Sequence, residues 1–233
     1  MDTRKLAPGF FYWKAPHPEW TPEKDVKGGW GQMVGCVYFE APDAIVLIDP
    51  LAPPDGSPDG VEFWNALDSD VERAKRPVAI LLANHYHQRS SAKIAERYPG
   101  TTVHGSKHLV GKTERAVDAT FVDGDVLPGG VKARSIRGME DDETTFYIPP
   151  HKAMFLADAL IGIGDGGVRV VPRKWAPEGE EAGKRYEAEF RNSLRKLLNV
   201  PIDMLLVSHG EPVTSYGSAA LAEALEAEAW GEE

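Results

Sequence analysis

The chain has 233 residues, of which 42% are apolar and 27% charged, and its 26 basic and 36 acidic side chains give a net charge of −10. This composition is typical of a globular protein with a sizeable core, and the negative charge argues against nucleic acid or an anionic membrane as partner. Cys36 is the only cysteine, so no internal disulfide can form. The lone cysteine, the short apolar runs and an amino-terminal stretch without a signal-like apolar segment predict a cytoplasmic protein.

Short runs rich in apolar and β-branched residues predict strands along most of the chain. We expect these strands at 9–15, 32–40, 44–50, 77–83, 101–106, 120–127, 131–138, 144–149, 153–158 and 202–210. Residues 41–43 contain a proline and an aspartate, and they predict a tight turn between the second and third strands.

Apolar residues spaced three or four apart predict helices between the strands. We expect these helices at 61–74, at about 90–100, at 180–199 and in the Ala/Glu/Leu-rich carboxyl-terminal segment. Residues 162–183 are rich in glycine and predict an irregular excursion long enough to be functional. The sequence has no repeat or linker, so a single domain over residues 1–233 is predicted.

Side chains with metal-binding chemistry follow three of the predicted strands. His85 and His87 follow an apolar run, and Asp158 and His209 each end another strand. Because alternate residues of a strand point to the same side, we expect His85 and His87 to face one ion. Strand ends also carry polar residues because they meet water, so the pattern indicates a metal site without establishing one.

The order of these segments resembles the metallo-β-lactamase fold superfamily. The matching stretches lie within residues 31–212 and are AIVLIDP, ILLANHYHQRS at the position of the H-x-H-x-D-H motif, FVDGDVLPGG, MFLADAL and SLRKLLNVPIDMLLVSHGEP. The resemblance implies an α/β (α+β) fold, a four-layered αβ/βα sandwich of two mixed β-sheets flanked by helices. It also implies a metal cleft at one sheet edge and hydrolysis by a water held between two metal ions, commonly zinc.

Only part of the family's ligand set is present in this sequence. The resemblance retains four of seven ligand positions, which are His85, His87, Asp158 and His209. Arg89 and Ser90 replace the aspartate and the last histidine of the motif, and Met139 stands near the position of the next histidine. Arg89 is always protonated and offers only hydrogen-bond donors, so it cannot be an ordinary ligand. The sequence therefore predicts a degenerate site without a dinuclear centre.

The substitution of Arg89 suggests how such a site could remain stable. Without a second metal, Asp158 would be a partly buried carboxylate that lacks its cation, which is costly. We expect the Arg89 guanidinium to take the place of that metal and to pair with Asp158. The alternative is that Arg89 points to solvent and that the cleft has collapsed. The remaining donors could hold one divalent ion, with zinc the first choice and Glu140 or Asp141 as an extra ligand.

Three classes of function follow from these residues. The first is a binding or regulatory protein without dinuclear zinc hydrolase activity. The second is a mononuclear zinc, manganese or iron hydrolase of an ester, lactone, thioester or phosphodiester. The third is a metal-free enzyme that uses a histidine of the same cleft as acid or base. The residues predicted to act are His85, His87, Arg89, Asp158 and His209.

The predicted partner is a small-molecule ligand or substrate, with a homodimer left open and neither nucleic acid nor membrane expected. Aromatic residues near the amino terminus, from Phe10 to Trp30, are expected to fill the core. Trp175, which precedes the long helix, is the better candidate for a lid over the cleft.

Overall fold

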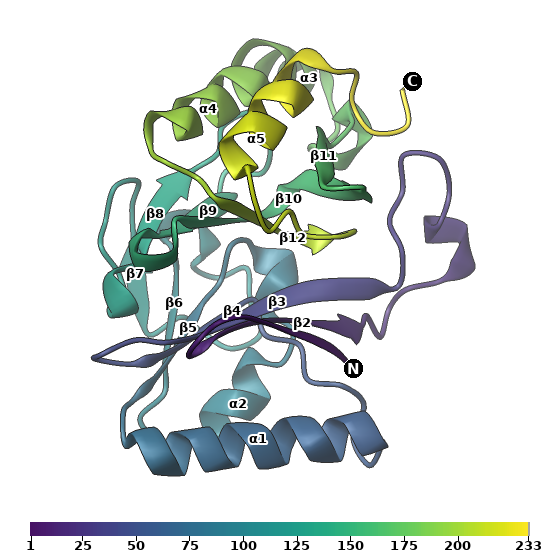
Figure 1. Ribbon diagram of the computed structural model, residues 1–233. Coiled ribbons are helices and arrows are strands. Elements are labelled where there is room, and N and C mark those ends of the chain that lie inside the picture. Colours follow the sequence, from purple (N-terminus) through teal and green to yellow (C-terminus); the bar gives the residue numbers. More distant parts are fainter. Residues whose placement is uncertain (233) are drawn as a thin grey trace.

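The computed structural model describes residues 1–232 and consists of two mixed β-sheets that lie face to face, with helices on the outer side of each (Figure 1). The amino-terminal sheet has the order β1-β2-β3-β4-β5-β6-β7. Its strands are β1 (Asp2–Ala7), β2 (Phe10–Pro16), β3 (Met33–Glu40), β4 (Ile45–Ile48), β5 (Val78–Leu81), β6 (Thr102–Ser106) and β7 (Ala119–Phe121). Helices α1 (Pro58–Ala74) and α2 (Ser91–Arg97) cover its outer face.

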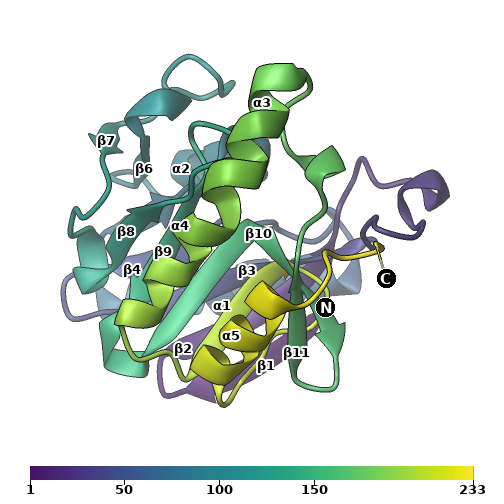
Figure 2. The same ribbon diagram turned by 90° about the horizontal axis from the view of Figure 1, so that it is seen from above.

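The carboxyl-terminal sheet is built around the long strand β10, which pairs with β9, β11 and β12. Its strands are β8 (Lys132–Ser135), β9 (Thr144–Ile148), β10 (Ala153–Gly164), β11 (Gly167–Val170) and β12 (Met204–His209). Helices α3 (Glu180–Arg185), α4 (Arg191–Arg195) and α5 (Gly217–Glu226) lie across its outer face (Figure 2). A π-helical turn at Tyr186–Phe190 joins α3 to α4, and a 3-10 turn at Lys196–Asn199 ends this helical run.

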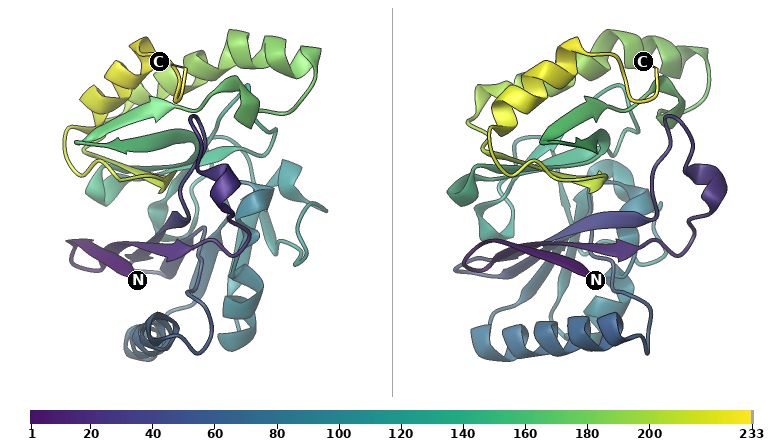
Figure 3. Two further views of the ribbon diagram at one scale, coloured as in Figure 1. Left: turned by 90° about the vertical axis from the view of Figure 1, so that its right-hand side faces the viewer. Right: turned by 45° about the vertical axis from the view of Figure 1, so that its right-hand side comes forward.

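Figure 3 shows the two sheets facing each other with helices on their outer sides. Three clusters of apolar side chains fill the spaces between these elements. In β3, Cys36 packs toward α1 and α2, whereas Val37 and Phe39 pack between the sheets. In β10, Phe155 packs between the sheets, whereas Met154 packs toward the carboxyl-terminal helices. Both faces of these strands are therefore buried, which explains their nearly continuous apolar sequences. The four-layered sandwich predicted from the sequence is confirmed.

Helix α1 is capped at both ends by residues suited to those positions. The Ser57 hydroxyl accepts a hydrogen bond from the Gly60 amide at 3.0 Å, and Pro58 occupies the first helical position. Lys75 ends the helix in the left-handed conformation.

Among the described residues no helix is long and apolar enough to cross a membrane.

The prediction of an irregular excursion over residues 162–183 is wrong for residues 162–170, whereas residues 171–179 contain only the 3-10 turn Arg173–Trp175. Strands β10 and β11 form a hairpin in the first part, with Gly164 opposite Gly167 and only two residues between them. Those residues, Asp165 and Gly166, have φ values of 50° and 74°. Positive φ at both positions is the requirement of a tight hairpin turn, for which Asp-Gly is a favoured sequence.

The two sheets meet where β3 passes β12, and a single residue pair, Val34 and His209, joins them. Gly35 is required at this junction. A Cβ atom on Gly35 would lie 2.2 Å from the Tyr12 hydroxyl and 2.3 Å from the Val207 carbonyl oxygen. The Tyr12 hydroxyl donates a hydrogen bond to that same carbonyl at 2.9 Å.

Replacing Gly35 by alanine should therefore push the two sheets apart. We expect Gly35→Ala to lower the free energy of unfolding by about 1–3 kcal/mol or more. Gly31→Ala is the matched control, because a Cβ atom there meets nothing within 4 Å and should change stability by less than about 0.5 kcal/mol. Equal stabilities of the two variants in urea denaturation would contradict this account of the junction.

Candidate functional site

Side chains from two strands and from the segments that follow two others meet beside the junction of the sheets. Asp49 follows β4, His87 follows β5, Asp158 lies within β10 and His209 ends β12. Asp158 falls where the pairing of β10 with β12 is interrupted, between the pairs Leu156–Val207 and Ile161–His209. This irregularity leaves room for the Asp158 side chain at the interruption.

The Asp158 carboxylate is shared by two histidines. Its Oδ1 lies 3.2 Å from His87 Nε2 and 3.1 Å from His209 Nε2. On the other side of the His87 ring, Nδ1 lies 2.6 Å from Asp49 Oδ2. Asp49 in turn accepts a hydrogen bond from the Ala83 amide at 2.8 Å, so its carboxylate is fixed. We call His87, Asp158 and His209 the central group.

Because both ring nitrogens of His87 face carboxylates, the ring is held as an imidazolium. Burial and the nearby Arg89 charge lower the pKa of His87, but Asp158 and Asp49 raise it more, to about 9. Burial alone would raise the pKa of Asp158, yet His87 and His209 lower it well below its usual value. Burial lowers the pKa of His209, which donates from Nε2 and leaves its buried Nδ1 without a partner.

His85 does not join the central group, so its prediction as a partner of His87 is wrong. Strand β5 ends at Leu81, and residues His85–Gln88 form a 3-10 turn. The Asn84 side chain caps this turn by accepting a hydrogen bond from the Tyr86 amide at 3.0 Å. The alternation of a strand no longer holds in such a turn, so His85 and His87 point to different places.

A second group consists of His85, Glu140 and Asp142, whose donor atoms lie within 4.8 Å of one another. Asp142 Oδ2 accepts the His85 amide at 3.0 Å and lies 2.9 Å from His85 Nδ1. Glu140, predicted as an extra ligand, thus meets His85 and not the central group. Asp141, the other predicted extra ligand, belongs to neither group and pairs with Arg185 at 2.6 Å.

The predicted ion pair between Arg89 and Asp158 does not form within the described part of the chain. Arg89 Nη1 donates to the backbone oxygens of Asp49 at 2.9 Å and Gly35 at 3.1 Å, and Nη2 reaches the Ser208 hydroxyl at 3.4 Å. The alternative of an arginine in solvent is also wrong, because Arg89 lines the same cavity as His87 and His209. Its backbone has a φ of 37° and a ψ of −115°, a sparsely populated conformation.

Sequence reasoning missed three buried acidic residues that support this site. Asp49 and Asp142 have just been described, and Glu143 is the third. Glu143 accepts hydrogen bonds from the Asn84 side chain at 2.8 Å and from the Asp158 amide at 3.1 Å. Burial and the Asp158 charge raise the pKa of Glu143 to about 8. Asp49 could have been found, because it directly follows the apolar run Ile45–Ile48 just as Asp158 follows an apolar run in the sequence.

Two tryptophans cover His209 and form the walls of the cleft. The Trp30 and Trp175 rings lie 4.8 and 5.2 Å from the His209 ring, centre to centre. Trp175 donates from its indole to the Gly28 carbonyl at 2.8 Å, which ties it to the loop that carries Trp30. Both line two hollows of about 220 Å³ each, which share Asp158. Trp175 thus lies where the sequence predicts a lid. Trp30 packs against the amino-terminal core, as expected, and also lines the cleft.

Comparison with solved structures reveals close similarity of fold at low sequence identity. A metallo-β-lactamase from Pontibacter korlensis is 15% identical, with 97% of this chain and 99% of that chain covered and a TM-score of 0.65. A metallo-β-lactamase family protein from Thermus thermophilus is 16% identical, with 95% and 80% covered and a TM-score of 0.62. The mono-zinc form of FIM-1 from Pseudomonas aeruginosa is 10% identical, with 97% and 94% covered and a TM-score of 0.64.

These likenesses establish that the chain has the metallo-β-lactamase fold, as the motifs predicted. No protein-family model matches the sequence, and no curated protein matches it either. At sequence identities of 10–16%, the similarity supports a conclusion about the fold alone. The chemistry of the cleft must therefore be inferred from the residues of this chain.

The central group fits one divalent ion. Two imidazoles and a carboxylate offer donor atoms within 4.8 Å of one another, a ligand set that zinc accepts. Asp49 on the far nitrogen of His87 would orient that ring as carboxylates do in zinc sites. The second group, His85, Glu140 and Asp142, shares no residue with the central group, and Lys112 Nζ lies 3.5 Å from its Asp142 carboxylate.

The raised pKa of His87 predicts how stability depends on pH in the metal-free protein. The folded state binds this proton more tightly than the unfolded chain, whose histidine pKa is 6.5. The stabilisation is therefore complete below about pH 6.5 and lost as the pH rises through about 9. A shift of this size corresponds to about 3 kcal/mol.

Urea denaturation of chelator-treated protein from pH 6.5 to 9.5 measures this loss. The His87→Gln variant should be less stable overall but should lose less stability between pH 8 and 9.5, because the His87 contribution is gone. The loss that remains in both proteins includes that of Glu143, whose pKa of about 8 lies at the lower end of this range. Parallel curves for wild type and variant would mean that His87 is not an imidazolium between two carboxylates.

Proposed function

We propose that this metallo-β-lactamase-fold protein binds a small organic molecule in its cleft and does not assemble a dinuclear hydrolytic centre. The observation that carries the proposal is the position of Arg89. Its guanidinium is fixed by two backbone carbonyls beside the central group, at a chain position where the fold's metal motif has an aspartate. A ligand carboxylate is thereby replaced by a permanent cation.

The charges of the cleft support this proposal. Asp49 and Asp158 carry the negative charges, and the His87 imidazolium and Arg89 balance them. Arg89 lowers the pKa of both His87 and His209, so its field disfavours any further positive charge on either ring. A dication would have to displace the His87 proton and also bind against this field. In this proposal the negative charges of the central group and Asp49 are balanced by the His87 imidazolium and the Arg89 guanidinium, without a metal ion.

The shape of the cleft suits a small ligand. Trp30, Tyr86 and Trp175 provide aromatic walls, and His87, Arg89 and Asp158 provide polar anchors. Cavities lined mainly by aromatic side chains with a few polar groups are typical binding sites for small molecules. We infer that the cleft holds a compact organic ligand with a hydrogen-bonding group directed at the central group.

A mononuclear metal hydrolase is the second candidate. It is favoured by the three convergent donors of the central group and by Asp49 behind His87. An ion there would be held by His87, Asp158 and His209 and would supply Lewis-acid activation of a water. The two candidates differ in how strongly the wild-type protein binds zinc.

Removing the charge of Arg89 should strengthen zinc binding. We expect Arg89→Met, which keeps a long side chain, to bind zinc about tenfold or more tightly than wild type because the repulsive cation is gone. Arg195→Met is the matched control, since Arg195 is exposed, pairs with Glu226 and has the same charge. Calorimetric titration of chelator-treated protein measures all three affinities.

The control variant should bind zinc within about twofold of wild type. Loss of the Arg89 hydrogen bonds should cost Arg89→Met about 1–3 kcal/mol of stability, so its folding is verified by circular dichroism before titration. Tight, stoichiometric zinc in the wild-type protein, unchanged in Arg89→Met, would favour the mononuclear enzyme and contradict the proposal.

A substrate panel separates binding from catalysis. We expect wild-type protein to hydrolyse esters, lactones, thioesters and phosphodiesters no faster with added zinc or manganese than without, because Arg89 stands in place of a ligand. His209→Gln serves as the matched variant, since it removes one donor of the central group. Metal-stimulated turnover that disappears in His209→Gln would establish the mononuclear hydrolase instead.

A further inference from the structure

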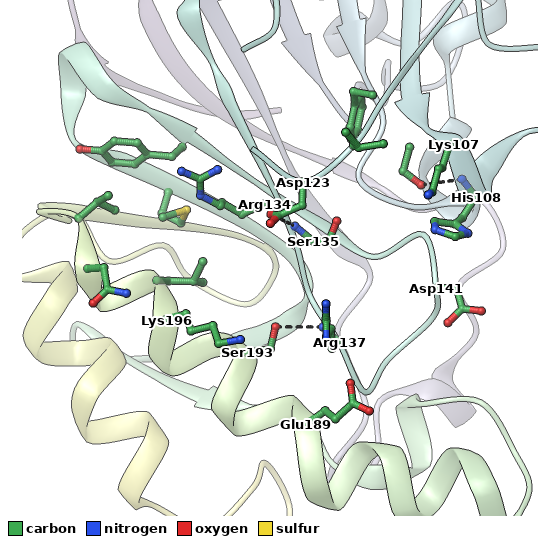
Figure 4. Close-up of a pocket in the computed structure, with 18 of the residues that line it drawn as sticks. Lys107, His108, Asp123, Arg134, Ser135, Arg137, Asp141, Glu189, Ser193 and Lys196 are labelled. Atoms are coloured by element: carbon green, nitrogen blue, oxygen red, sulfur yellow. Dashed lines mark hydrogen bonds between the residues drawn. The ribbon is translucent and has the colours of Figure 1, made fainter. Parts of the chain in front are cut away.

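A second cavity lies apart from the central group, where the carboxyl-terminal sheet and its helical run approach the segments after β6 and β7 (Figure 4). It has a volume of about 780 Å³, compared with about 220 Å³ for each hollow of the cleft. Its walls come from the turn after β6, from β8, from the loop before β9 and from the helical run α3–α4 with the turn that ends it. None of its lining residues belongs to the central group.

Basic side chains from separate elements surround this cavity. Lys107 comes from the turn after β6, Arg134 from β8, Arg137 from the loop and Lys196 from the end of the helical run. In Figure 4, Lys196 extends from the helical run toward Arg137, and Lys107 comes from the opposite wall. Across residues 1–232, no carboxylate lies within ion-pair distance of these four side chains.

The basic side chains around the cavity outnumber the acidic ones. Asp141 pairs with Arg185, the fifth cation of the lining, at 2.6 Å. The other carboxylates of the lining are Glu189 and Asp123, whose Oδ1 accepts a hydrogen bond from the Ser135 amide at 3.0 Å. Five cations thus face three carboxylates, which leaves an excess of positive charge. A locally basic hollow in a chain with a net charge of −10 is energetically suited to an anion.

The floor of the cavity is apolar. It includes Phe121, Met154 and Leu197, which are buried, and the ring of Tyr147, whose hydroxyl donates to the Pro201 carbonyl at 3.0 Å. The Ser193 hydroxyl accepts a hydrogen bond from the Arg137 amide at 3.0 Å, which holds the loop against the helix. An apolar floor beneath a basic rim fits a molecule that has an organic body and anionic groups.

We propose that this cavity binds a small organic polyanion, with its phosphate or carboxylate groups held by Arg137 and Lys196 and its body on the apolar floor. The proposal goes beyond the function proposed for the cleft and does not depend on it. No residue that lines this cavity belongs to the central group or lines the two hollows of the cleft. The loop before β9 is nevertheless common to both, since Arg137 and Asp141 face the cavity while Glu140 and Asp142 face His85.

Three probes test the proposal with the full chain: ADP, inorganic pyrophosphate and citrate. ADP and citrate distinguish phosphate from carboxylate groups, and pyrophosphate lacks the organic body. We expect saturable binding of ADP or citrate by calorimetry, tighter than that of pyrophosphate. Amide shifts in NMR spectra should be centred on residues 106–108, 134–137 and 193–199 and not on residues 84–89.

The variant Arg137→Gln/Lys196→Gln should weaken this binding about tenfold or more, because two charge-assisted contacts are lost. Arg195→Gln/Lys184→Gln is the matched control: it removes the same charge from the same helical run, outside the cavity, and should change affinity less than about twofold. All four side chains are exposed, so melting temperatures should stay close to that of wild type.

The proposal would be overturned if none of the three probes showed saturable binding at concentrations up to about 5 mM. A site of this kind should have a dissociation constant well below that concentration. It would equally be overturned by an equal loss of affinity in the two double variants, which would mean a general charge effect. Shifts confined to residues 84–89 would place the bound anion in the cleft and would also contradict it.

Discussion

The Asp158 carboxylate is the constraint on which the junction of the two sheets depends. It is largely buried at the point where β10 departs from its pairing with β12, and a carboxylate in such a place must be hydrogen-bonded and balanced in charge. Two histidines from opposite sheets provide both, His87 from the amino-terminal side and His209 from the carboxyl-terminal side. The same contacts therefore hold the sheets together and shape the floor of the cleft.

Arg89 acts on this group from a distance fixed by the backbone. Its guanidinium is bound to the carbonyl oxygens of Gly35 and Asp49, close to the junction, and not to the carboxylate it was expected to neutralise. The cation nevertheless contributes to the balance, because its field reaches both histidines. Charge compensation in the cleft is thus spread over His87 and Arg89, and this arrangement is the physical basis for proposing a site without two metal ions.

Most of the fold could be predicted from the sequence because its strands are buried on both faces. Such strands appear as short apolar runs, and their order, with helices between them, is enough to indicate the sandwich. The error over residues 162–170 has a local cause. The glycines there favour irregular structure as a sequence pattern, whereas Asp165 and Gly166 form the turn of a hairpin in which positive φ is required.

The candidate site could be predicted only in part. The structure brings Asp158 and His209 together as the sequence predicts, although only His209 ends a strand and Asp158 lies within β10, where its pairing with β12 is interrupted. His85 was misplaced because Asn84 caps a 3-10 turn, and no periodic pattern in HYHQ distinguishes that turn from a strand. The Arg89 contacts could not be predicted either, since they are made to backbone oxygens of residues about 40 and 54 positions away.

The number of metal ions that the cleft accepts tests the central claim most directly. Diffraction from crystals grown with zinc, collected on both sides of the zinc absorption edge, locates each bound ion. Our account predicts at most one zinc ion, held by His87, Asp158 and His209, with Arg89 still bound to the carbonyls of Gly35 and Asp49. Two zinc ions about 3.5–4 Å apart beside Asp158, the separation of dinuclear hydrolytic centres, would contradict it.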